Sequence, residues 1–408
     1  MKIVIAGAGI AGITAAEAAR ESDPKAEITV FSQERELLYF RPRLPEVVAG
    51  KVTQDKILVH PAEWYQEKKI ELRKGESLVE VNLEDKLIRG SLGSRQYFDR
   101  LLIATGAESN KPPLPGLDLA GVYAVRRLTE AAHLFYEADR SREAVLVGSG
   151  LLGLEMGYAL TARGLKVHVM ERSGRILPRQ TTPKSAAKLQ RMLAKLGFEF
   201  HLGKNAVKAV GLTRVEKVIL DSGEELPAQL LILAAGIVPN VSLARTLGLK
   251  IDRSIVVDEY LETSMPGIYA AGDCAQSKDG FSGLWTISRA QGLIAGANLA
   301  AAEPGARTAY RAAPPSSTLK VAGIDLVAVG NIDPDDKLTG LEAETETAYR
   351  KVVLDSQGLL VGFTNLGTRA GNRELTAAAG RKIIPDSMRN ELTEASFDFA
   401  KLDALPQA

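Results

Sequence analysis

The sequence predicts an α/β protein with two parallel β-sheets and a smaller α+β unit at its C-terminal end. Three observations support this prediction. A glycine-rich motif occurs twice, each time directly after a short apolar run. An apolar run that ends in small residues is also repeated, at 101–106 and 231–236, and from about residue 312 onward apolar residues alternate as in β-strands. A chain of 408 residues is long enough for two or three domains.

The two glycine motifs each predict a strand, a tight turn and a helix. They are Gly7-Ala8-Gly9-Ile10-Ala11-Gly12 and Gly148-Ser149-Gly150-Leu151-Leu152-Gly153. The preceding runs, 2–6 and 144–147, are short and apolar throughout, which indicates strands buried on both faces. In this context the first glycine permits the turn, the second lets backbone approach a pyrophosphate, and the third lets the helix pack against its strand. Because phosphates lie at the positive end of such a helix, the chain is predicted to bind two dinucleotides in two Rossmann-like domains.

Each motif is followed by a second predicted strand, at 27–31 and 166–170. Glu171 comes directly after the latter, where an acid can hydrogen-bond the ribose hydroxyl groups. Further along, a strand at 267–271 leads into Gly272 and Asp273, and we expect a helix of small residues to follow and to end at Ala302.

The C-terminal part is predicted to contain strands and one basic helix. We expect strands at 319–329 and 348–354, and a turn at 356–358 that leads into a strand at 359–363. A helix is expected over 368–382, with basic residues at Arg369, Arg373, Arg381 and Lys382.

Composition limits the classes of partner and chemistry. The chain has 51 Lys and Arg residues against 50 Asp and Glu, so its net charge gives no reason to expect nucleic acid or a membrane surface as partner. Its single cysteine, Cys274, excludes a disulfide framework and a two-cysteine relay within these residues, and we expect it to serve packing. The apolar opening is expected to be a buried strand rather than an export signal. No apolar stretch approaches the roughly 20 residues of a membrane span. We therefore expect a soluble, cytoplasmic protein, and we predict no metal site.

Taken in order along essentially the whole chain, the motifs resemble those of the two-dinucleotide flavoprotein reductases of the glutathione-reductase-like superfamily. Within it the chain is most similar to the rubredoxin reductases and to the flavin part of assimilatory nitrite reductase. The resemblance rests on both glycine motifs together with Ala104-Thr105-Gly106, Ala235-Gly236, Ala271-Gly272-Asp273 and the stretch 319–326. It implies an FAD-binding domain at 1–110 and 237–312, an NAD-binding domain at 111–236, and a small C-terminal domain at 313–408 that covers the flavin.

The resemblance implies the residues that contact FAD. The first glycine motif, including Ile10 and Ala11, would hold the pyrophosphate, and Ala104, Thr105 and Gly106 would lie along the phosphate side of the flavin. Gly272 and Asp273 would lie near the ribityl chain, although Asp273 could instead cap a helix. Either Ser32 or Glu34 could bind the adenosine ribose.

The resemblance also implies the residues that contact NAD. These are the second glycine motif, including Leu151 and Leu152, together with Ala235, Gly236 and Glu171. A carboxylate at Glu171 would favour NADH over NADPH, because it binds a free ribose and repels a 2'-phosphate. Arg172 and Arg175 could oppose that preference by pairing with a phosphate, the alternative being solvated loop arginines. Glu155 would face the flavin and the nicotinamide, the alternative being a carboxylate stabilised by the helix dipole.

The stretch 38–45 is where disulfide reductases of this superfamily carry cysteines, and here it has none. Without a thiol, two-electron sulfur chemistry has no carrier, so reduced flavin would pass electrons directly to an outside acceptor. Arg41 or Arg43 would stabilise negative charge on the flavin, the alternative being exposed loop arginines. Lys320 would lie on the same surface, and the basic helix could add a rim that attracts a small acidic carrier.

The predicted activity is that of an FAD-dependent NADH oxidoreductase that passes electrons to a small one-electron carrier such as rubredoxin, with Glu155, Arg41 and Lys320 nearest the chemistry. One alternative is an NADH oxidase that produces hydrogen peroxide. Another is a non-catalytic redox sensor or scaffold that binds FAD and NAD. The chain is expected to be a monomer or a homodimer.

Overall fold

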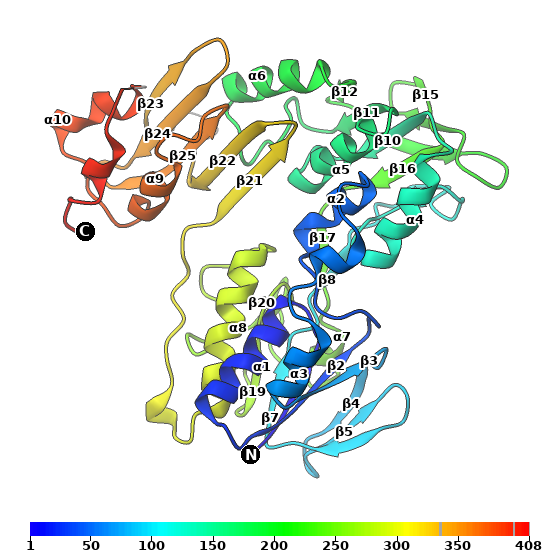
Figure 1. Ribbon diagram of the computed structural model, residues 1–408, viewed down its shortest axis with the longest axis vertical. Helices are drawn as coiled ribbons and strands as arrows, with labels where there is room; N and C mark the ends of the chain where they lie inside the picture. The colour runs from blue at the N-terminus through cyan, green and yellow to red at the C-terminus, as the bar shows by residue number, and fades with distance from the viewer. Residues whose placement is uncertain (334–336, 395, 408) are drawn as a thin grey trace. The chain divides into compact units, whose positions relative to one another are not determined.

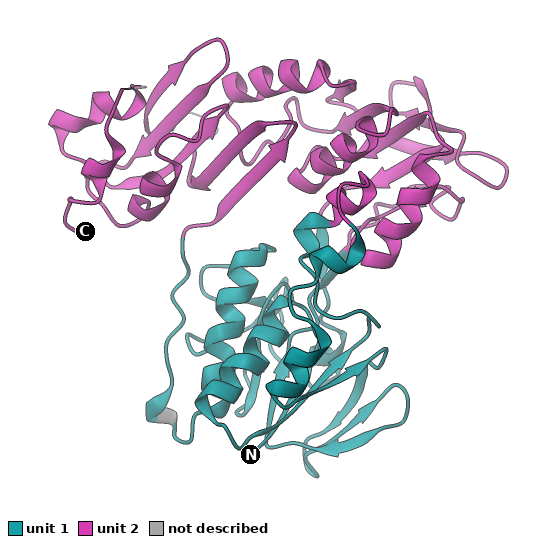
Figure 2. Ribbon diagram, viewed as in Figure 1, with its two compact units in different colours: residues 1–43, 53–108, 237–313 teal, residues 44–52, 109–236, 314–408 magenta. Residues whose placement is uncertain are grey.

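The structure is a computed structural model that describes residues 1–333, 337–394 and 396–407. These residues form two compact units, shown in teal and magenta in Figure 2. The first unit contains residues 1–43, 53–108 and 237–313, and the second contains 44–52, 109–236 and 314–408. Among the described residues, every helix is too short or too polar to cross a lipid bilayer.

The first unit is built on a five-stranded parallel sheet with the order β19-β7-β1-β2-β3. Its strands are β1 (Lys2–Ala6), β2 (Glu27–Ser32), β3 (Ile70–Lys74), β7 (Arg100–Ile103) and β19 (Ile268–Ala270). The central strand β1 is buried from Ile3 to Ala6, which explains its unbroken apolar sequence. A three-stranded antiparallel sheet follows β3, formed by β4 (Leu78–Asn82), β5 (Leu87–Gly90) and β6 (Arg95–Tyr97).

Two helices of small residues lie side by side in this unit, α1 (Ile10–Ser22) and α8 (Trp285–Ala300) (Figure 1). A Cβ atom added to Gly292 would lie 2.3 Å from the carbonyl oxygen of Ala11. The close approach of the two backbones therefore requires glycine at that position. The helix predicted to follow Asp273 and to end at Ala302 exists, but it begins only at Trp285 and ends at Ala300.

The second unit repeats this arrangement. Its five-stranded parallel sheet has the order β12-β11-β10-β16-β9. The strands are β9 (Val122–Tyr123), β10 (Glu143–Val147), β11 (Lys166–Glu171), β12 (Phe198–Leu202) and β16 (Leu230–Leu233). A second three-stranded sheet contains β13 (Ala206–Val210), β14 (Lys217–Leu220) and β15 (Glu225–Pro227). The internal repeat is thus a repeat of topology with one difference. The edge strand next to β7, β19, comes after the other strands of its sheet in the chain, whereas the edge strand next to β16, β9, comes before the others.

The C-terminal part of the second unit is an antiparallel sheet with the order β21-β22-β25-β24-β23. Its strands are β21 (Ser316–Val321), β22 (Ile324–Gly330), β23 (Thr339–Glu344), β24 (Tyr349–Leu354) and β25 (Leu360–Leu366). Helices α9 (Asn372–Ala378) and α10 (Asp386–Arg389) follow it. Residues from this sheet, from α9 and from the segments after it share one hydrophobic core, which includes Val352, Phe363, Leu375 and Leu392.

Two predicted C-terminal elements were wrong in their bounds. The strand expected over 319–329 is a hairpin, because the chain turns at Ala322 and Gly323, which have φ angles of 49° and 80°. The helix expected over 368–382 is only seven residues long, since Gly371 and Gly380 adopt the left-handed conformation on either side of it. The turn at 356–358 does join β24 to β25, as predicted. The α/β class, with two Rossmann-like sheets and a C-terminal α+β part, is confirmed, and the domain boundaries stay a prediction.

Candidate functional site

The first glycine motif forms the tight turn between β1 and α1. Gly7 has a φ angle of 117°, and a Cβ atom there would lie 2.2 Å from the carbonyl oxygen of Ala104. A Cβ atom on Gly12 would lie 1.9 Å from the carbonyl oxygen of Gly7. Gly9 differs, because a Cβ atom there would meet nothing within 4 Å. The outer glycines are thus required by the fold, whereas the middle one keeps a surface open for a ligand.

The second glycine motif repeats this geometry between β10 and α5 (Leu151–Thr161). Gly148 has a φ angle of 103°, and its Cβ atom would lie 2.5 Å from the carbonyl oxygen of Ala234. The Cβ atom of Gly153 would lie 2.7 Å from the carbonyl oxygen of Gly148, while that of Gly150 would meet nothing within 4 Å. In both units, therefore, the outer two glycines of the motif have no room for a Cβ atom, whereas the middle glycine has free space beside it.

Helix starts complete the two turns. Gly9 is the N-cap of α1 and Gly150 is the N-cap of α5, and neither offers a side chain to the amides of the first helical turn. Those amides, at Ile10 and Ala11 in one unit and at Leu151 and Leu152 in the other, begin the helices beside the open glycines. Amides at a helix start favour negatively charged groups. Both turns therefore fit the pyrophosphate of a dinucleotide.

Glu171 lies at the end of β11 and is held by the second glycine turn. Its carboxylate accepts hydrogen bonds from Ser149 N (3.0 Å), Ser149 Oγ (2.7 Å) and Ser173 N (2.9 Å). Burial acts to raise the pKa of Glu171, but these hydrogen bonds keep the pKa below its ordinary value. Glu171 is therefore charged at neutral pH and fixed beside the turn. The serine that ends β2, Ser32, donates instead to the carbonyl oxygen of Glu34 (2.9 Å).

Glu34, Tyr39 and Arg41 form a closed network in the first unit. Arg41 donates from Nη2 to Glu34 Oε1 (2.8 Å) and from Nη1 to the Tyr39 hydroxyl (2.7 Å), which in turn donates to Glu34 Oε2 (2.6 Å). Burial acts to lower the pKa of Arg41, but Tyr39, Glu34 and Asp273 raise it. Arg41 therefore carries a positive charge that hydrogen bonds hold in place, rather than being an exposed loop arginine. Arg43 donates to the carbonyl oxygen of Lys56 (3.2 Å).

The turn at Gly272 and Asp273 lies against the start of α1. A Cβ atom on Gly272 would lie 2.9 Å from the Cβ atom of Ala11, and Asp273 Oδ1 accepts a hydrogen bond from Ser288 Oγ (3.0 Å). The alternative that Asp273 caps a helix is wrong, because α8 begins at Trp285 with Leu284 as its N-cap. Asp273 therefore belongs to the turn that contacts the first glycine motif.

The two small-residue segments that follow β7 and β16 differ in their hydrogen bonds. Thr105 Oγ1 donates to the carbonyl oxygen of Asn240 (2.7 Å), and Gly106 follows with a φ angle of 68°. In the other segment, the carbonyl oxygens of Ala235 and Gly236 accept from the side chain (3.2 Å) and backbone (2.9 Å) of Asn110. Asn110 was not among the predicted residues, since nothing near it in sequence points to this contact.

Glu155 lies on α5 in the second unit, in an environment that raises its pKa strongly. Burial raises its pKa to about 7; the nearby backbone N–H of Lys320 acts to lower the pKa, and the like charge of Glu46 acts to raise it. Glu46 lies on the short helix α2 (Leu44–Val48), which packs against α5. The structure thus brings together two predicted residues, Glu155 and Lys320, and adds Glu46, which the sequence analysis missed.

The basic residues near α9 do not form the predicted helical row. Only Arg373 lies on α9, and it pairs with Glu374 (2.9 Å). Arg369 precedes the helix and pairs with Asp325 (2.5 Å). The positive charge at this surface is therefore partly neutralised by acids of the same chain.

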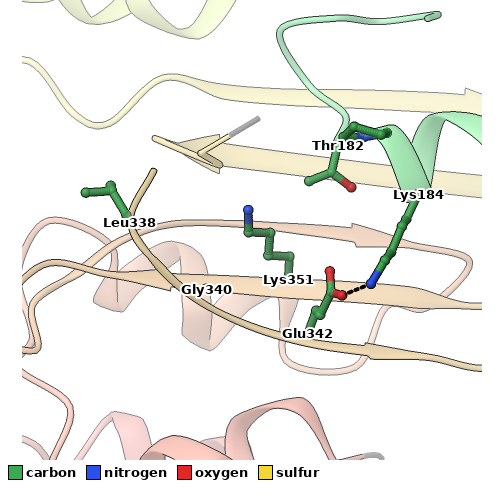
Figure 3. Close-up of a pocket in the computed structure, with 7 residues that line it drawn as sticks. Thr182, Lys184, Leu338, Gly340, Glu342 and Lys351 are labelled. Atoms are coloured by element: carbon green, nitrogen blue, oxygen red, sulfur yellow. Dashed lines mark hydrogen bonds and ion pairs between the residues drawn. The ribbon is translucent and has the colours of Figure 1, made fainter. Parts of the chain in front are cut away.

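A pocket of about 330 Å³ lies elsewhere in the second unit, where α6 (Pro183–Ala194) meets the C-terminal sheet (Figure 3). Lys184 and Glu342 form an ion pair across it, and Lys351 Nζ donates to the carbonyl oxygen of Asp333 (2.7 Å). The pocket is lined by Thr182, Pro183, Lys184, Leu338, Gly340, Glu342 and Lys351. It contains none of the predicted site residues.

Comparison with known proteins agrees with this geometry. Residues 1–293 match the pyridine nucleotide-disulphide oxidoreductase family, and residues 315–368 match the rubredoxin NAD+ reductase C-terminal domain. The chain is 29% identical to a rubredoxin-NAD(+) reductase of Ectopseudomonas oleovorans, over 95% of this chain and all of that protein. It is 32% identical to the assimilatory nitrate reductase electron transfer subunit of Bacillus subtilis over 86% of this chain, but it spans only 46% of that protein.

A solved structure shares the fold along nearly the whole chain. The ferredoxin reductase from Rhodopseudomonas palustris aligns with a TM-score of 0.88 and 25% identity, over 98% of this chain and 99% of that one. The family match covers both glycine turns, Glu171 and the turn at Asp273. The chain therefore belongs to the pyridine nucleotide-disulphide oxidoreductase family, which fits the expected cofactors FAD and NADH.

Proposed function

We propose that this chain oxidises NADH through bound FAD and passes the electrons one at a time to a small redox protein, with rubredoxin as the first candidate. The observation that carries the proposal is the absence of a usable thiol. The segment 38–45 has no cysteine, and Cys274, the single cysteine of the 408 residues, is fully buried. Burial also raises the pKa of Cys274, which disfavours the reactive thiolate. The match to a rubredoxin reductase C-terminal domain supports the choice of acceptor.

FAD, when bound, accepts a hydride from NADH and can release electrons singly. The chain supplies binding, orientation and charge. We assign the first glycine turn, with Thr105, Gly106 and Asp273, to FAD, and the second glycine turn, with Ala235 and Gly236, to NADH. If Glu34 keeps its hydrogen bonds to Tyr39 and Arg41, Ser32 would bind the FAD ribose; if Glu34 releases them, its carboxylate would bind the ribose instead.

Three side chains are assigned roles in the reaction. Glu171 would accept hydrogen bonds from the hydroxyl groups of the NADH ribose. Its fixed negative charge would also repel the 2'-phosphate of NADPH. Arg41 would place positive charge near the flavin and so favour its reduced, anionic form. Glu155 would contact the nicotinamide, and with a pKa of about 7 a large fraction of it is neutral at neutral pH.

The acceptor is proposed to dock near Lys320, whose side chain is exposed on β21. A small acidic protein would be attracted by this charge, and the attraction would weaken as salt screens it. The contribution of Arg369 and Arg373 is reduced by their acidic partners, so the docking effect should depend mainly on Lys320 and Arg381.

An acceptor comparison tests this function. The FAD-loaded protein is given NADH with rubredoxin, ferredoxin, a quinone or oxygen in parallel, and NADH oxidation is followed. We expect turnover with rubredoxin to exceed turnover with oxygen alone by at least about tenfold. Turnover with oxygen that equals turnover with rubredoxin, with peroxide as product, would make the chain an NADH oxidase. Slow turnover with every acceptor, together with a long-lived reduced flavin, would indicate a redox sensor.

A further inference from the structure

Two histidines and a glutamate meet on one face of the parallel sheet in the second unit. His168 lies on β11, and Glu199 and His201 lie on the neighbouring edge strand β12. His168 is in register with Glu199, and His201 lies two residues further along, so all three side chains are on the same face. Glu171, three residues after His168, is on the opposite face. The cluster is therefore separate from the proposed NADH-binding residue.

The distances within the cluster suit one metal ion. His168 Nδ1 lies 3.2 Å from His201 Nε2 and 3.6 Å from Glu199 Oε2, and a ligand atom from each of the three residues lies within 4.8 Å of the other two. Two ligands that each lie about 2.0–2.1 Å from a tetrahedral ion are about 3.3 Å apart. Two of the three separations, at 3.2 and 3.6 Å, are therefore close to the value that a single tetrahedral ion requires.

Carboxylates hold the outer nitrogen of each ring. His168 Nε2 lies 3.3 Å from Glu143 Oε2, and His201 Nδ1 lies 3.4 Å from Glu224 Oε1. When the outer nitrogens donate to these carboxylates, the inner nitrogens present lone pairs to each other. In metal sites, a histidine usually binds the ion through one ring nitrogen and donates the N–H of its other ring nitrogen to a carboxylate.

The row of groups from Glu143 to Glu224 contains fewer N–H groups than contacts. The row from Glu143 through His168 and His201 to Glu224 contains three contacts, and each contact needs a proton or a cation between two acceptors. Two neutral rings supply two N–H groups, whichever tautomers they adopt. One of the three contacts is therefore left without an N–H group, which leaves a ring nitrogen lone pair for a metal ion.

We propose that His168, His201 and Glu199 bind one divalent first-row transition-metal ion, with Zn²⁺ as the first candidate and water in the remaining position. Imidazole and carboxylate ligands in this number suit Zn²⁺. Lys166 Nζ pairs with Glu199 Oε2 (2.7 Å), the oxygen that faces His168 Nδ1, and Lys204 Nζ pairs with Glu224 Oε2 (2.5 Å). Metal binding therefore requires Lys166 to share this oxygen or to leave it, while both ring nitrogens stay clear of the lysines. The ion would link β11 to the edge strand β12 and stabilise the second unit.

Metal titration of the full-length, FAD-loaded protein tests the proposal. After treatment with a chelator and removal of the chelator, calorimetry with Zn²⁺ should show one ion bound per chain, and saturation should raise the melting temperature by about 2 °C or more. Co²⁺ should give absorption bands of a tetrahedral ion at longer wavelengths than oxidised flavin absorbs.

Variants identify the ligands. His201→Gln should weaken Zn²⁺ binding by at least about tenfold. Since His201 is buried, Glu199→Gln provides a second variant at a side chain that is 49% exposed, and it should weaken binding in the same direction. His133→Gln removes an exposed histidine of α4 (Leu128–Ala138) and should leave binding unchanged. Failure of the wild type to bind Zn²⁺ or Co²⁺ would overturn the proposal, and so would binding that survives both His201→Gln and Glu199→Gln, because the ion would then lie elsewhere.

Discussion

Glu155 on α5 lies near Lys320 on β21, where the backbone N–H of Lys320 lowers the pKa of Glu155 and so opposes part of the effect of burial, and the first strand of the C-terminal sheet packs against the helix that follows the second glycine turn. This contact links two residues that lie 165 positions apart in the sequence but in the same compact unit. It also places Glu155 where burial and Glu46 both favour the neutral acid. The raised pKa of Glu155 can therefore be tested through the pH dependence of protein stability, without any coenzyme.

Glu155 should make the stability of the protein depend on pH. Its folded pKa of about 7 lies above the ordinary value of 4.5, so the folded state holds the proton more tightly than the unfolded state. The stabilisation is therefore fully present below about pH 4.5 and is lost as the pH rises through 7, to a total of up to about 3 kcal/mol. Urea unfolding at pH 5.5 and 8.5 should show this loss in the wild type but a smaller one in Glu155→Gln. The exposed Glu391→Gln is the control and should behave as the wild type.

The two kinds of glycine in the first motif should separate folding from binding. Gly12→Ala places a Cβ atom 1.9 Å from a carbonyl oxygen and should cost at least about 1–3 kcal/mol of stability. Gly9→Ala meets no protein atom within 4 Å and should fold normally, but it should bind FAD more weakly because the methyl group fills the approach to the pyrophosphate. Urea unfolding and FAD titration measure the two effects. Equal loss of stability in both variants would contradict this division.

Glu171 should control the choice between NADH and NADPH. Glu171→Gln removes the negative charge that repels a 2'-phosphate, so the ratio of kcat/KM for NADH to that for NADPH should fall by about tenfold or more. Arg172→Gln is the matched control, since it tests whether a neighbouring arginine sets the preference instead. If the ratio stays constant in Glu171→Gln, Glu171 does not bind the ribose.

Arg41 should raise the reduction potential of the flavin. Arg41→Gln removes a fixed positive charge, so the two-electron potential should become more negative by about 30 mV for each 1.4 kcal/mol of lost stabilisation. Arg43→Gln removes a neighbouring arginine that hydrogen-bonds Lys56 and should have a smaller effect. An unchanged potential in Arg41→Gln would mean that the network with Glu34 and Tyr39 serves only the fold.

Electron transfer to rubredoxin should depend on salt. The rate should fall as ionic strength rises, because exposed charges more than about 10 Å apart are largely screened at 0.1 M salt. Lys320→Gln should lower the rate at low salt and flatten its salt dependence, while Lys25→Gln, an exposed lysine of the first unit, should change neither. A rate that does not vary with salt in the wild type would refute docking by charge.

Local patterns predicted the two sheets and both glycine turns well, because buried parallel strands are short apolar runs and the turns require glycine sterically. The C-terminal hairpin was missed because Gly323 is the one turn signal within an otherwise alternating run, and its partner in the turn, Ala322, has a positive φ angle that the sequence does not indicate. Contacts between distant segments were also missed. Glu46 beside Glu155 is an example, as is the cluster of His168, Glu199 and His201, whose members come from two strands and show no ligand spacing along the chain.

The central claim is that electrons leave the flavin without passing through sulfur, and an anaerobic titration with NADH tests it most directly. Without a redox-active thiol, about one equivalent of NADH should bleach the flavin completely, and rubredoxin added afterwards should restore the oxidised spectrum. A requirement for about two equivalents of NADH, or a reduced flavin that rubredoxin cannot reoxidise, would contradict the account.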